Sequence, residues 1–393
     1  MNFINTKPVR LIELFAGIGS QAKALRNIGV NFEHWYVCEF DEHAMRSYNT
    51  VHNTNFATSD ITKITANDIN ICDTEHFTYL LTYSFPCQDL SSAGKGRGME
   101  KGSGTRSGLL WEVERLLNEC TELPQVLLME NVPPVHSDRN KEHFDKWVEF
   151  LASKGYSNHW KDLNSKNFGV PQNRNRCFMV SILGNYTYEF PKEIPLELRL
   201  IDLLENEVAD KFYITPEKVK EIVKSLPPIT KRTTGLIAKQ ATEYKKETDI
   251  SNTLMARDYK GFGNQEMNCV IEPVRIGGLY DIGDRKHQAD SIWCKETIAP
   301  TIDTMQGGNR QPLITIEDDC LELRIRKLTP KECWRLMGFD DDDFEKAERV
   351  NSNTQLYKQA GNSIVVNVLM AILKELFIPA KTHSEWLDEL LRR

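Results

Sequence analysis

The stretch FAGIGSQA, residues 15–22, decides the fold, because two glycines in it join an apolar run to a helical pattern. The apolar run RLIELF (10–15) predicts a buried strand, and the spacing of apolar residues predicts a helix over 20–28. Gly17 and Gly19 allow a tight turn between the two and a close approach of a ligand to the backbone. The segment therefore predicts a strand–turn–helix unit whose turn binds a ligand.

A carboxylate at the end of the next apolar run narrows the class of ligand. Glu39 follows Gly19 by twenty residues and closes the run HWYVCEF (34–40), where it can accept hydrogen bonds from ribose hydroxyls. With Ala22, the turn also fits a loose G-x-G-x-x-A dinucleotide pattern. The pattern predicts an adenosine-type cofactor without saying which one.

Short apolar runs alternate with helical patterns through the first part of the chain. The runs are nearly continuous, as expected for strands with both sheet faces covered. Strand–helix–strand repetition predicts an α/β fold with a parallel sheet and right-handed crossovers. The predicted strands are 10–15, 34–40, 79–85, 126–130 and 177–182, and the clearest helices are 20–28 and 141–154.

The pattern changes near residue 183, where prolines and glycine-rich turns predict a smaller, irregular, β-rich region. Helical order returns after residue 323. A helix over 329–339 has Thr329 as its N-cap and Gly338 as its stop, and 355–377 is the longest helical pattern of the chain. The two outer parts are expected to build one domain around the inserted one. The predicted domain ranges are 1–182, 183–323 and 324–393.

Composition limits the class of protein. Of 393 residues, 40% are hydrophobic and 27% charged, with a net charge of −7, which is typical of a soluble globular protein. No apolar run approaches the roughly 20 residues that span a bilayer, and the start of the chain lacks a secretory pattern. We therefore expect a cytoplasmic protein without a membrane partner. The nine cysteines form no C-x-x-C pair, so no metal site is predicted.

One cysteine stands in an unusual setting. Pro86 fixes the chain just before Cys87, at the end of a predicted strand, and a Gly/Ser-rich stretch follows. A lone cysteine is usually an inert core thiol. At the carboxyl end of a sheet strand, beside a basic loop, it instead suits a nucleophile near a polyanion. The cations of that loop are Lys95, Arg97, Lys101 and Arg106.

Three further segments carry polar residues beside apolar ones, although each alone has an ordinary structural explanation. Glu130 ends an apolar strand, where a raised pKa would suit a proton donor. Arg174 and Arg176 alternate just before a buried strand, so both are expected to point the same way. The segment 361–363 (GNS) is expected to open an apolar helix and to face a ligand.

In this order, FAGIGS, PCQ, ENV, QNRNR and GNS resemble the motifs of the DNA (cytosine-5) methyltransferase family. The resemblance covers about 1–182 and 324–377, and the ordered set is very specific. It implies a Rossmann-like domain that binds S-adenosylmethionine and releases S-adenosylhomocysteine, with 183–323 as the target recognition domain. The residues implied to bind the cofactor are Phe15, Ala16, Gly17, Gly19, Glu39, Phe40, Asp60, Ile61, Pro86, Asn362 and Ser363.

The resemblance also implies the catalytic roles. Cys87 would attack C6 of cytosine, Glu130 would hydrogen-bond or protonate N3, and Arg176, with Arg174, would position the base. The target base must flip out of duplex DNA, which basic loop residues would help by clamping phosphates. The candidate DNA-binding residues are Gln88, Ser91, Lys95, Arg97, Arg106, Arg257, Lys260, Asn309 and Arg310.

Several alternatives stay open at this point. A tRNA cytosine-5 methyltransferase belongs to the same family, although the long insertion favours duplex DNA. An NAD-dependent oxidoreductase would rest on the glycine pattern alone, and a binder without activity would not need Cys87. For the favoured function we expect a monomer in a bacterial or phage-infected cell, accompanied in some systems by a restriction endonuclease.

Overall fold

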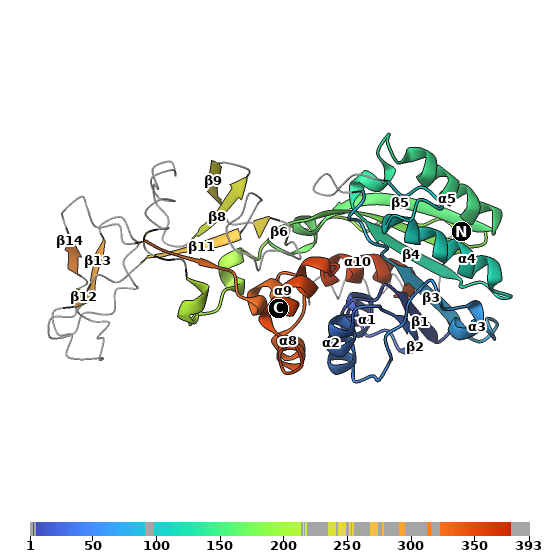
Figure 1. The fold of residues 1–393 in the computed structure, drawn as a ribbon, viewed down its shortest axis with the longest axis horizontal. Helices are drawn as coiled ribbons and strands as arrows, with labels where there is room; N and C mark the ends of the chain where they lie inside the picture. Colours follow the sequence, from blue (N-terminus) through green and yellow to red (C-terminus); the bar gives the residue numbers. More distant parts are fainter. Residues whose placement is uncertain are drawn as a thin grey trace.

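The computed structural model describes residues 5–90, 98–213 and 323–378, positions 3, 215, 217, 251, 252 and 254, and the strands within 235–315. Its centre is a six-stranded sheet in the order β2-β1-β3-β4-β7-β5 (Figure 1). The strands are β1 Val9–Leu14, β2 Phe32–Cys38, β3 Thr78–Tyr83, β4 Val126–Asn131, β5 Tyr156–Asn164 and β7 Asn175–Leu183.

Helices cover both faces of this sheet, which explains the nearly continuous apolar runs. Leu11 and Leu80 point to the face covered by α1 and α10, whereas Ile12 and Leu81 point to the face covered by α4 and α5. The predicted α/β class is therefore confirmed. The helices are α1 Ser20–Asn27, α2 Glu42–His52, α3 Ala66–Ile69, α4 Leu110–Glu119, α5 Lys141–Ser153, α7 Pro330–Arg335, α8 Asp341–Glu348, α9 Asn353–Asn362 and α10 Val366–Phe377.

The expectation of an all-parallel sheet was wrong for one strand, β7. Strands β1 to β4 pair in parallel, but β7 runs antiparallel to both β4 and β5. The connection from β4 through α5 leaves the width of one strand between β4 and β5. Strand β7 lies in this space and runs in the opposite direction to both. The sequence of β5 is too polar, and too exposed at the sheet edge, to be recognised as a strand.

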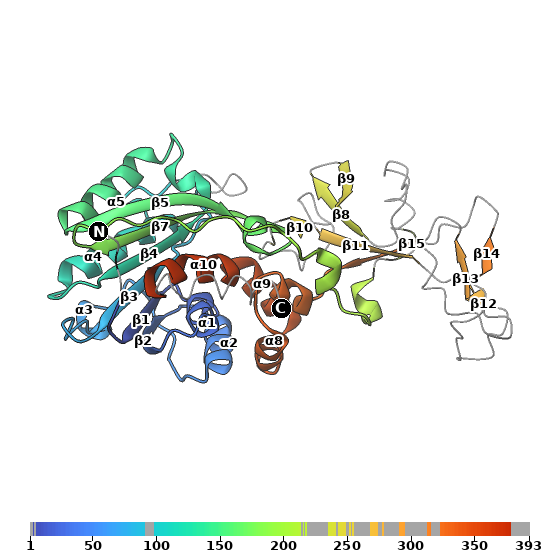
Figure 2. The ribbon, with the colours of Figure 1, turned by 180° about the vertical axis from the view of Figure 1, so that it is seen from behind.

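The late helices join the core of the first part of the chain. Helix α10 packs alongside α1 (Figures 1 and 2), and their apolar side chains belong to one buried cluster. Helix α7 begins with the predicted N-cap Thr329, and Gly338 adopts the left-handed φ of +83° expected of a stop. The exact domain boundaries stay a prediction, and residues 379–393 lie outside the described part.

The long helical pattern over 355–377 forms two helices instead of one. Ser363 is extended (φ −69°, ψ 162°), so Gly361 and Asn362 end α9 and do not open α10. Arg174 causes this break. Its guanidinium donates to the carbonyl oxygens of Gly361 and Ser363 at 3.1 and 2.7 Å, so these oxygens do not need the backbone amides that a continuous helix would supply.

Shorter elements connect and extend this core. Strands β8, β9, β11 and β15 form a four-stranded sheet, and β12 to β14 a three-stranded one, both lying away from the six-stranded sheet (Figure 1). Strands β6 and β10 pair in parallel as a separate two-stranded sheet. The bounds of the strands in these smaller sheets are β6 Gln172–Asn173, β8 Gly235–Gln240, β9 Glu243–Thr248, β10 Ser251–Asn252, β11 Asn268–Pro273, β12 Gly277–Gly278, β13 Ser291–Cys294, β14 Leu313–Thr315 and β15 Leu323–Lys327. The short 3-10 helices are η1 Ser107–Leu109, η2 Pro133–His136, η3 Ser165–Phe168, η4 Leu200–Leu203 and η5 Asp210–Phe212.

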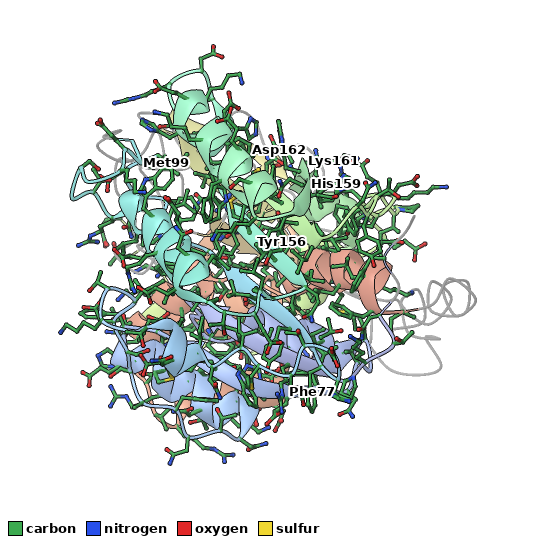
Figure 3. All side chains as sticks on the ribbon, turned by 90° about the vertical axis from the view of Figure 1, so that its right-hand side faces the viewer. Phe77, Met99, Tyr156, His159, Lys161 and Asp162 are labelled. Atoms are coloured by element: carbon green, nitrogen blue, oxygen red, sulfur yellow. The ribbon has the colours of Figure 1, made fainter. Side chains whose placement is uncertain are left out.

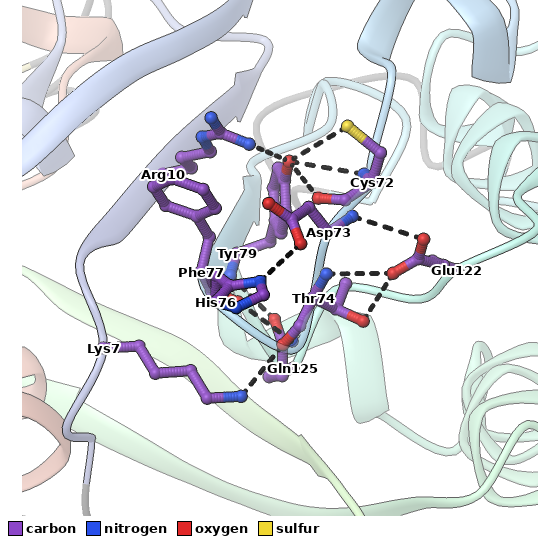
Figure 4. A network of polar contacts seen from close by, with 10 residues as sticks. All are labelled: Lys7, Arg10, Cys72, Asp73, Thr74, His76, Phe77, Tyr79, Glu122 and Gln125. Carbon is purple, nitrogen blue, oxygen red and sulfur yellow. Dashed lines mark hydrogen bonds and ion pairs between the residues drawn. The ribbon is translucent and has the colours of Figure 1, made fainter.

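A polar network ties the loops at the amino ends of the parallel strands (Figure 4). The Gln125 side chain accepts from the Tyr79 amide at 2.7 Å and donates to the carbonyls of Thr74 and Phe77. Glu122 accepts from the amide and hydroxyl of Thr74. These bonds satisfy backbone groups at the end of the sheet opposite to the strand carboxyl ends.

Among the described residues, no single helix is long and apolar enough to cross a bilayer. Helices α9 and α10 reach that length only together, and a bend of 41° separates them.

We expect the substitution Glu332→Leu to lower the free energy of unfolding by about 3–5 kcal/mol, because it removes the partner of a buried charge. Glu332 and Arg326 have fully buried side chains joined at 2.8 and 2.9 Å. Urea unfolding of both proteins measures the loss. Glu345→Leu, at an exposed ion pair on α8, should change the value by less than about 0.5 kcal/mol. A loss for Glu332→Leu no larger than that of the control would contradict the prediction.

Candidate active site

The site is a cavity of about 220 Å³ at the carboxyl ends of the parallel strands. Strand order reverses there, because β2 and β3 lie on opposite sides of β1, and open α/β sheets bind ligands at such points. The last residues of α9 close the cavity from the other side. Its lining comprises Phe15, Gly17, Ile18, Glu39, Asp41, Ala44, Ser84, Phe85, Pro86, Cys87, Gln88, Glu130, Asn131, Val132, Arg174, Arg176, Lys358, Gln359, Gly361, Asn362 and Ser363.

Cys87 lies in the loop that leaves β3, and its carbonyl accepts from the Leu90 amide at 3.0 Å. Burial raises the pKa of its thiol above the ordinary value, and the Glu130 carboxylate raises it further. The guanidinium groups of Arg176 and Arg174 act in the opposite direction but do not prevail. Without a substrate the group is therefore mainly a thiol at neutral pH, and its reactivity depends on the charge of its neighbours.

Glu130 and Arg176 form an ion pair next to this thiol, with Oε1 and Nε 3.2 Å apart. The two come from adjacent antiparallel strands, β4 and β7. Burial raises the pKa of Glu130, against the opposing effect of Arg176 and Arg174. A carboxyl group with a raised pKa, held by an arginine, is suited to donate a proton or a hydrogen bond.

Arg174 has a different place from Arg176, although both line the cavity as expected. It is buried and donates to three carbonyl oxygens, those of Leu254, Gly361 and Ser363, at 2.7 to 3.1 Å. It therefore fixes the end of α9 against the strand that carries Arg176. Its charge reaches the thiol and the carboxyl group, but its described hydrogen bonds are structural.

The glycine turn forms the other half of the cavity. Gly17 has a φ of +57°, and nothing lies within 4 Å of the position that a Cβ atom would take on it. Its amide donates to Glu39 at 2.8 Å, and the second Glu39 oxygen accepts from the Asp41 amide at 2.8 Å. Phe15 has a left-handed φ of +58°, which is rare for an aromatic residue and typical of functional sites.

Gly19 allows the turn to pack closely against His52. A Cβ atom on it would lie 2.3 Å from Nε2 of His52, and the φ of +79° also disfavours any other residue. His52 in turn bonds the Ile18 carbonyl at 3.1 Å. This glycine therefore shapes the turn through packing and does not line the cavity itself.

Other predicted cofactor residues also lie outside the cavity lining. Ala16 and Ile61 are buried in the core, while Asp60 is half-buried and its side chain accepts from the amide and hydroxyl of Thr62. The Phe40 ring is 78% exposed. Their roles stay predictions.

The sequence patterns missed a second ion pair in the cavity. Asp41, the N-cap of α2, pairs with Lys358 of α9. Burial opposes the charge of Asp41, but Lys358 and the capped amides outweigh it and lower the pKa of Asp41. Gln359 beside it donates to the His43 carbonyl and accepts from Ser47. In the sequence, the only signs of this pair are the D-x-x-A pattern at the start of α2 and the QAGNS segment. Asp41 and Lys358 are 317 residues apart, so no local pattern connects them.

The candidate DNA-binding residues are only partly described. Gln88 lines the cavity mouth and is exposed, as is Arg106, whose guanidinium lies 3.5 Å from the Gln88 side-chain oxygen. Of the loop cations, Lys101 pairs with Glu114 at 2.8 Å. The remaining candidates, Ser91, Lys95, Arg97, Arg257, Lys260, Asn309 and Arg310, lie outside the described residues.

Comparison with known proteins places this site in a family. A family model for C-5 cytosine-specific DNA methylases matches residues 9–378. The chain belongs to this family. The expected family and enzyme class are thereby confirmed.

Curated relatives of the methylase include bacterial and phage enzymes. It is 36% identical over 297 residues to the type II methyltransferase M2.ScrFI of Lactococcus lactis subsp. cremoris, covering 75% of this chain and 66% of that protein. It is 31% identical to the orphan methyltransferase M.SssI of Spiroplasma monobiae, covering 94% and 98%.

A solved structure resembles the methylase over most of its length. The methyltransferase EhMeth of Entamoeba histolytica superimposes with a TM-score of 0.66 at 17% identity, covering 94% of this chain and 98% of EhMeth. At this identity the likeness supports the Rossmann-like fold alone.

Proposed function

We propose that the methylase transfers a methyl group to C5 of a cytosine that is flipped out of duplex DNA, within a short recognition sequence. One observation carries the proposal: Cys87 and the Glu130–Arg176 pair line the same cavity as the glycine turn at Gly17. A base in a stacked duplex cannot enter such a cavity, so it has to leave the stack, at a cost of a few kcal/mol.

The residues present fit S-adenosylmethionine as the cofactor. The open space over Gly17 admits a ligand close to the backbone, and Glu39 has free lone pairs beside it for ribose hydroxyls. The exposed Phe40 ring would lie against the adenine, and Asn362 and Ser363 would close the site from α9. When bound, the cofactor supplies an electrophilic methyl group and leaves as S-adenosylhomocysteine.

The remaining chemistry belongs to this chain and its cytosine substrate. The Cys87 thiolate forms a bond to C6, and the electron pair of the C5–C6 double bond becomes available at C5. Glu130 assists by donating a proton or a hydrogen bond to N3, while Arg176 holds the carboxyl group and the base in place. After C5 is methylated, loss of its proton restores the double bond and expels Cys87.

Contacts with DNA begin at the mouth of the cavity. Gln88 is placed to touch the flipped base or to fill the gap that it leaves, and Arg106 to bind a phosphate. We infer a monomer that acts on double-stranded DNA in the cytoplasm of a bacterial or phage-infected cell, either with a restriction endonuclease or as an orphan enzyme.

The test uses unmethylated plasmid DNA incubated with the purified protein and S-adenosylmethionine. Mapping 5-methylcytosine at base resolution should find it confined to one short motif. A parallel incubation with tRNA addresses the other substrate class of the family. Methylation of tRNA and none of DNA would overturn the proposal.

We expect Glu39→Ala to weaken S-adenosylmethionine binding by about tenfold or more, because a charge-assisted hydrogen bond contributes roughly 1.5–3 kcal/mol. Calorimetric titration of the protein with the cofactor measures the change. Glu33→Ala, which removes an exposed carboxylate from β2, the strand directly before Glu39, is the matched control and should bind as the unchanged protein does. Equal affinities for the two variants would exclude Glu39 from the cofactor site.

A further inference from the structure

A cluster of three different ligand-type side chains lies outside the cavity. The donor atoms of His136, Asp162 and Cys177 all lie within 4.8 Å of one another, and Nε2 of His136 is 3.0 Å from Oδ1 of Asp162. They come from η2, β5 and β7 respectively, and Figure 3 marks Asp162 on β5. None of the three has a part in the proposed reaction.

Strand register accounts for their meeting. Asp162 and Cys177 are direct partners in the antiparallel β5–β7 ladder, so their side chains stand side by side on one face of the sheet. Asn131, the last residue of β4, pairs with Cys177 on its other side, and η2 begins two residues later. The short path from β4 brings His136 over the same face.

Aromatic side chains fix the imidazole in place. The ring of Trp160 lies 4.7 Å from that of His136, with an interplanar angle of 36°, and Phe144 meets Trp160 edge-on at 5.5 Å. Such packing restricts rotation of His136, so its Nε2 is held toward Asp162 without a metal. A preorganised ligand loses less conformational entropy on binding an ion.

We propose that His136, Asp162 and Cys177 form a binding site for a divalent cation of the zinc type. Nitrogen, carboxylate oxygen and sulfur are the donors that Zn²⁺ takes, whereas Mg²⁺ and Ca²⁺ prefer oxygen alone. A thiolate and a carboxylate together balance the charge of the ion, and the thiol proton is released to solvent on binding. Three protein ligands leave a fourth position for water.

The surroundings allow an ion to enter. The side chains of His136 and Asp162 are 24% and 31% exposed, so the cluster opens to solvent on that side. Cys177 is fully buried and closes the other side. The proposal departs from the expectation, drawn from the lack of a C-x-x-C pair, that the chain binds no metal.

An ion at this position would tie together two segments that carry the proposed catalytic pair. Cys177 directly follows Arg176 on β7, and the η2 segment with His136 follows Glu130 on β4. The ion would therefore act as a clamp that holds the two strands in register outside the cavity. The metal site itself does not depend on the proposed function, because binding is measured without DNA or cofactor.

The experiment uses the full-length protein, freed of metal with a chelator and dialysed against Zn²⁺. We expect the unchanged protein to retain one more ion per chain than either His136→Ala or Cys177→Ser, as measured by elemental analysis. With Co²⁺ as a second probe, the unchanged protein should show a thiolate-to-cobalt charge-transfer band that both variants lack. Two separate variants guard against a folding defect in one of them, and circular dichroism checks both.

Matched controls exist elsewhere in the chain. His76→Ala removes an exposed histidine that pairs with Asp73 at 2.6 Å (Figure 4) and that belongs to no three-ligand cluster among the described residues. Cys333→Ser replaces another buried cysteine. Both controls should keep the ion. Equal zinc content in the unchanged protein, His136→Ala and Cys177→Ser would overturn the proposal.

Discussion

Replacing Cys87 by serine is expected to lower the rate of methyl transfer by roughly 10⁴-fold or more, because the attacking nucleophile is lost and the remaining residues provide no substitute. Serine is nearly the same size, but its hydroxyl does not ionise near neutral pH. The substitution should therefore leave the shape of the cavity unchanged. Cofactor and DNA affinity should therefore stay within about twofold of the unchanged protein.

The measurement combines a transfer assay with a trapping assay. DNA that carries 5-fluorocytosine has no C5 proton to lose, so the protein should remain covalently attached to it through Cys87. A band of protein–DNA adduct that resists denaturation is expected for the unchanged protein and should be absent for Cys87→Ser. Cys120→Ser, at a partly buried cysteine on the end of α4, serves as the control and should form the adduct normally. An adduct with Cys87→Ser would show that another residue is the nucleophile.

Sequence patterns predicted those parts of the structure that depend on residues close together in the chain. The turn at Gly17 and the helix after it follow from a glycine pattern between a strand and a helix. The start of α7 follows from the Thr329–Glu332 capping box. The resemblance of the ordered motifs to the family also predicts that Cys87, Glu130 and Arg176 act together, and the structure places all three around one cavity.

Features that depend on distant contacts were missed. The break at Ser363 arises because Arg174, which is distant in sequence, donates hydrogen bonds to carbonyl oxygens at the end of α9. The direction of β7 depends on where α5 places β5, which no local pattern records. The Asp41–Lys358 pair and the three-residue cluster around Asp162 likewise arise from register and packing, and the individual residues look ordinary in the sequence.

The substitution Glu130→Gln should have two effects of opposite sign, and together they define the role of this residue. Glutamine still donates a hydrogen bond but transfers no proton, so the rate of methyl transfer should fall by about 10²–10⁴-fold. The same change removes a negative charge that raises the pKa of Cys87. The thiol should therefore become more acidic, and its alkylation by iodoacetamide should begin at lower pH than in the unchanged protein.

The pH dependence of the transfer rate follows from the same carboxyl group. Burial raises the pKa of Glu130, so its protonated form persists to higher pH than in a free glutamate. Transfer that needs this proton declines as pH rises through the raised pKa, and Glu130→Gln should lose that decline. Mass spectrometry of the Cys87 peptide follows alkylation, with Glu119→Gln at an exposed position of α4 as the control. A Glu130→Gln variant within tenfold of full activity would show that the reaction does not need the proton of Glu130. A variant whose Cys87 is alkylated with an unchanged pH profile would show that the charge of Glu130 does not act on the thiol. The two outcomes are separate, because the first depends on proton transfer and the second on charge.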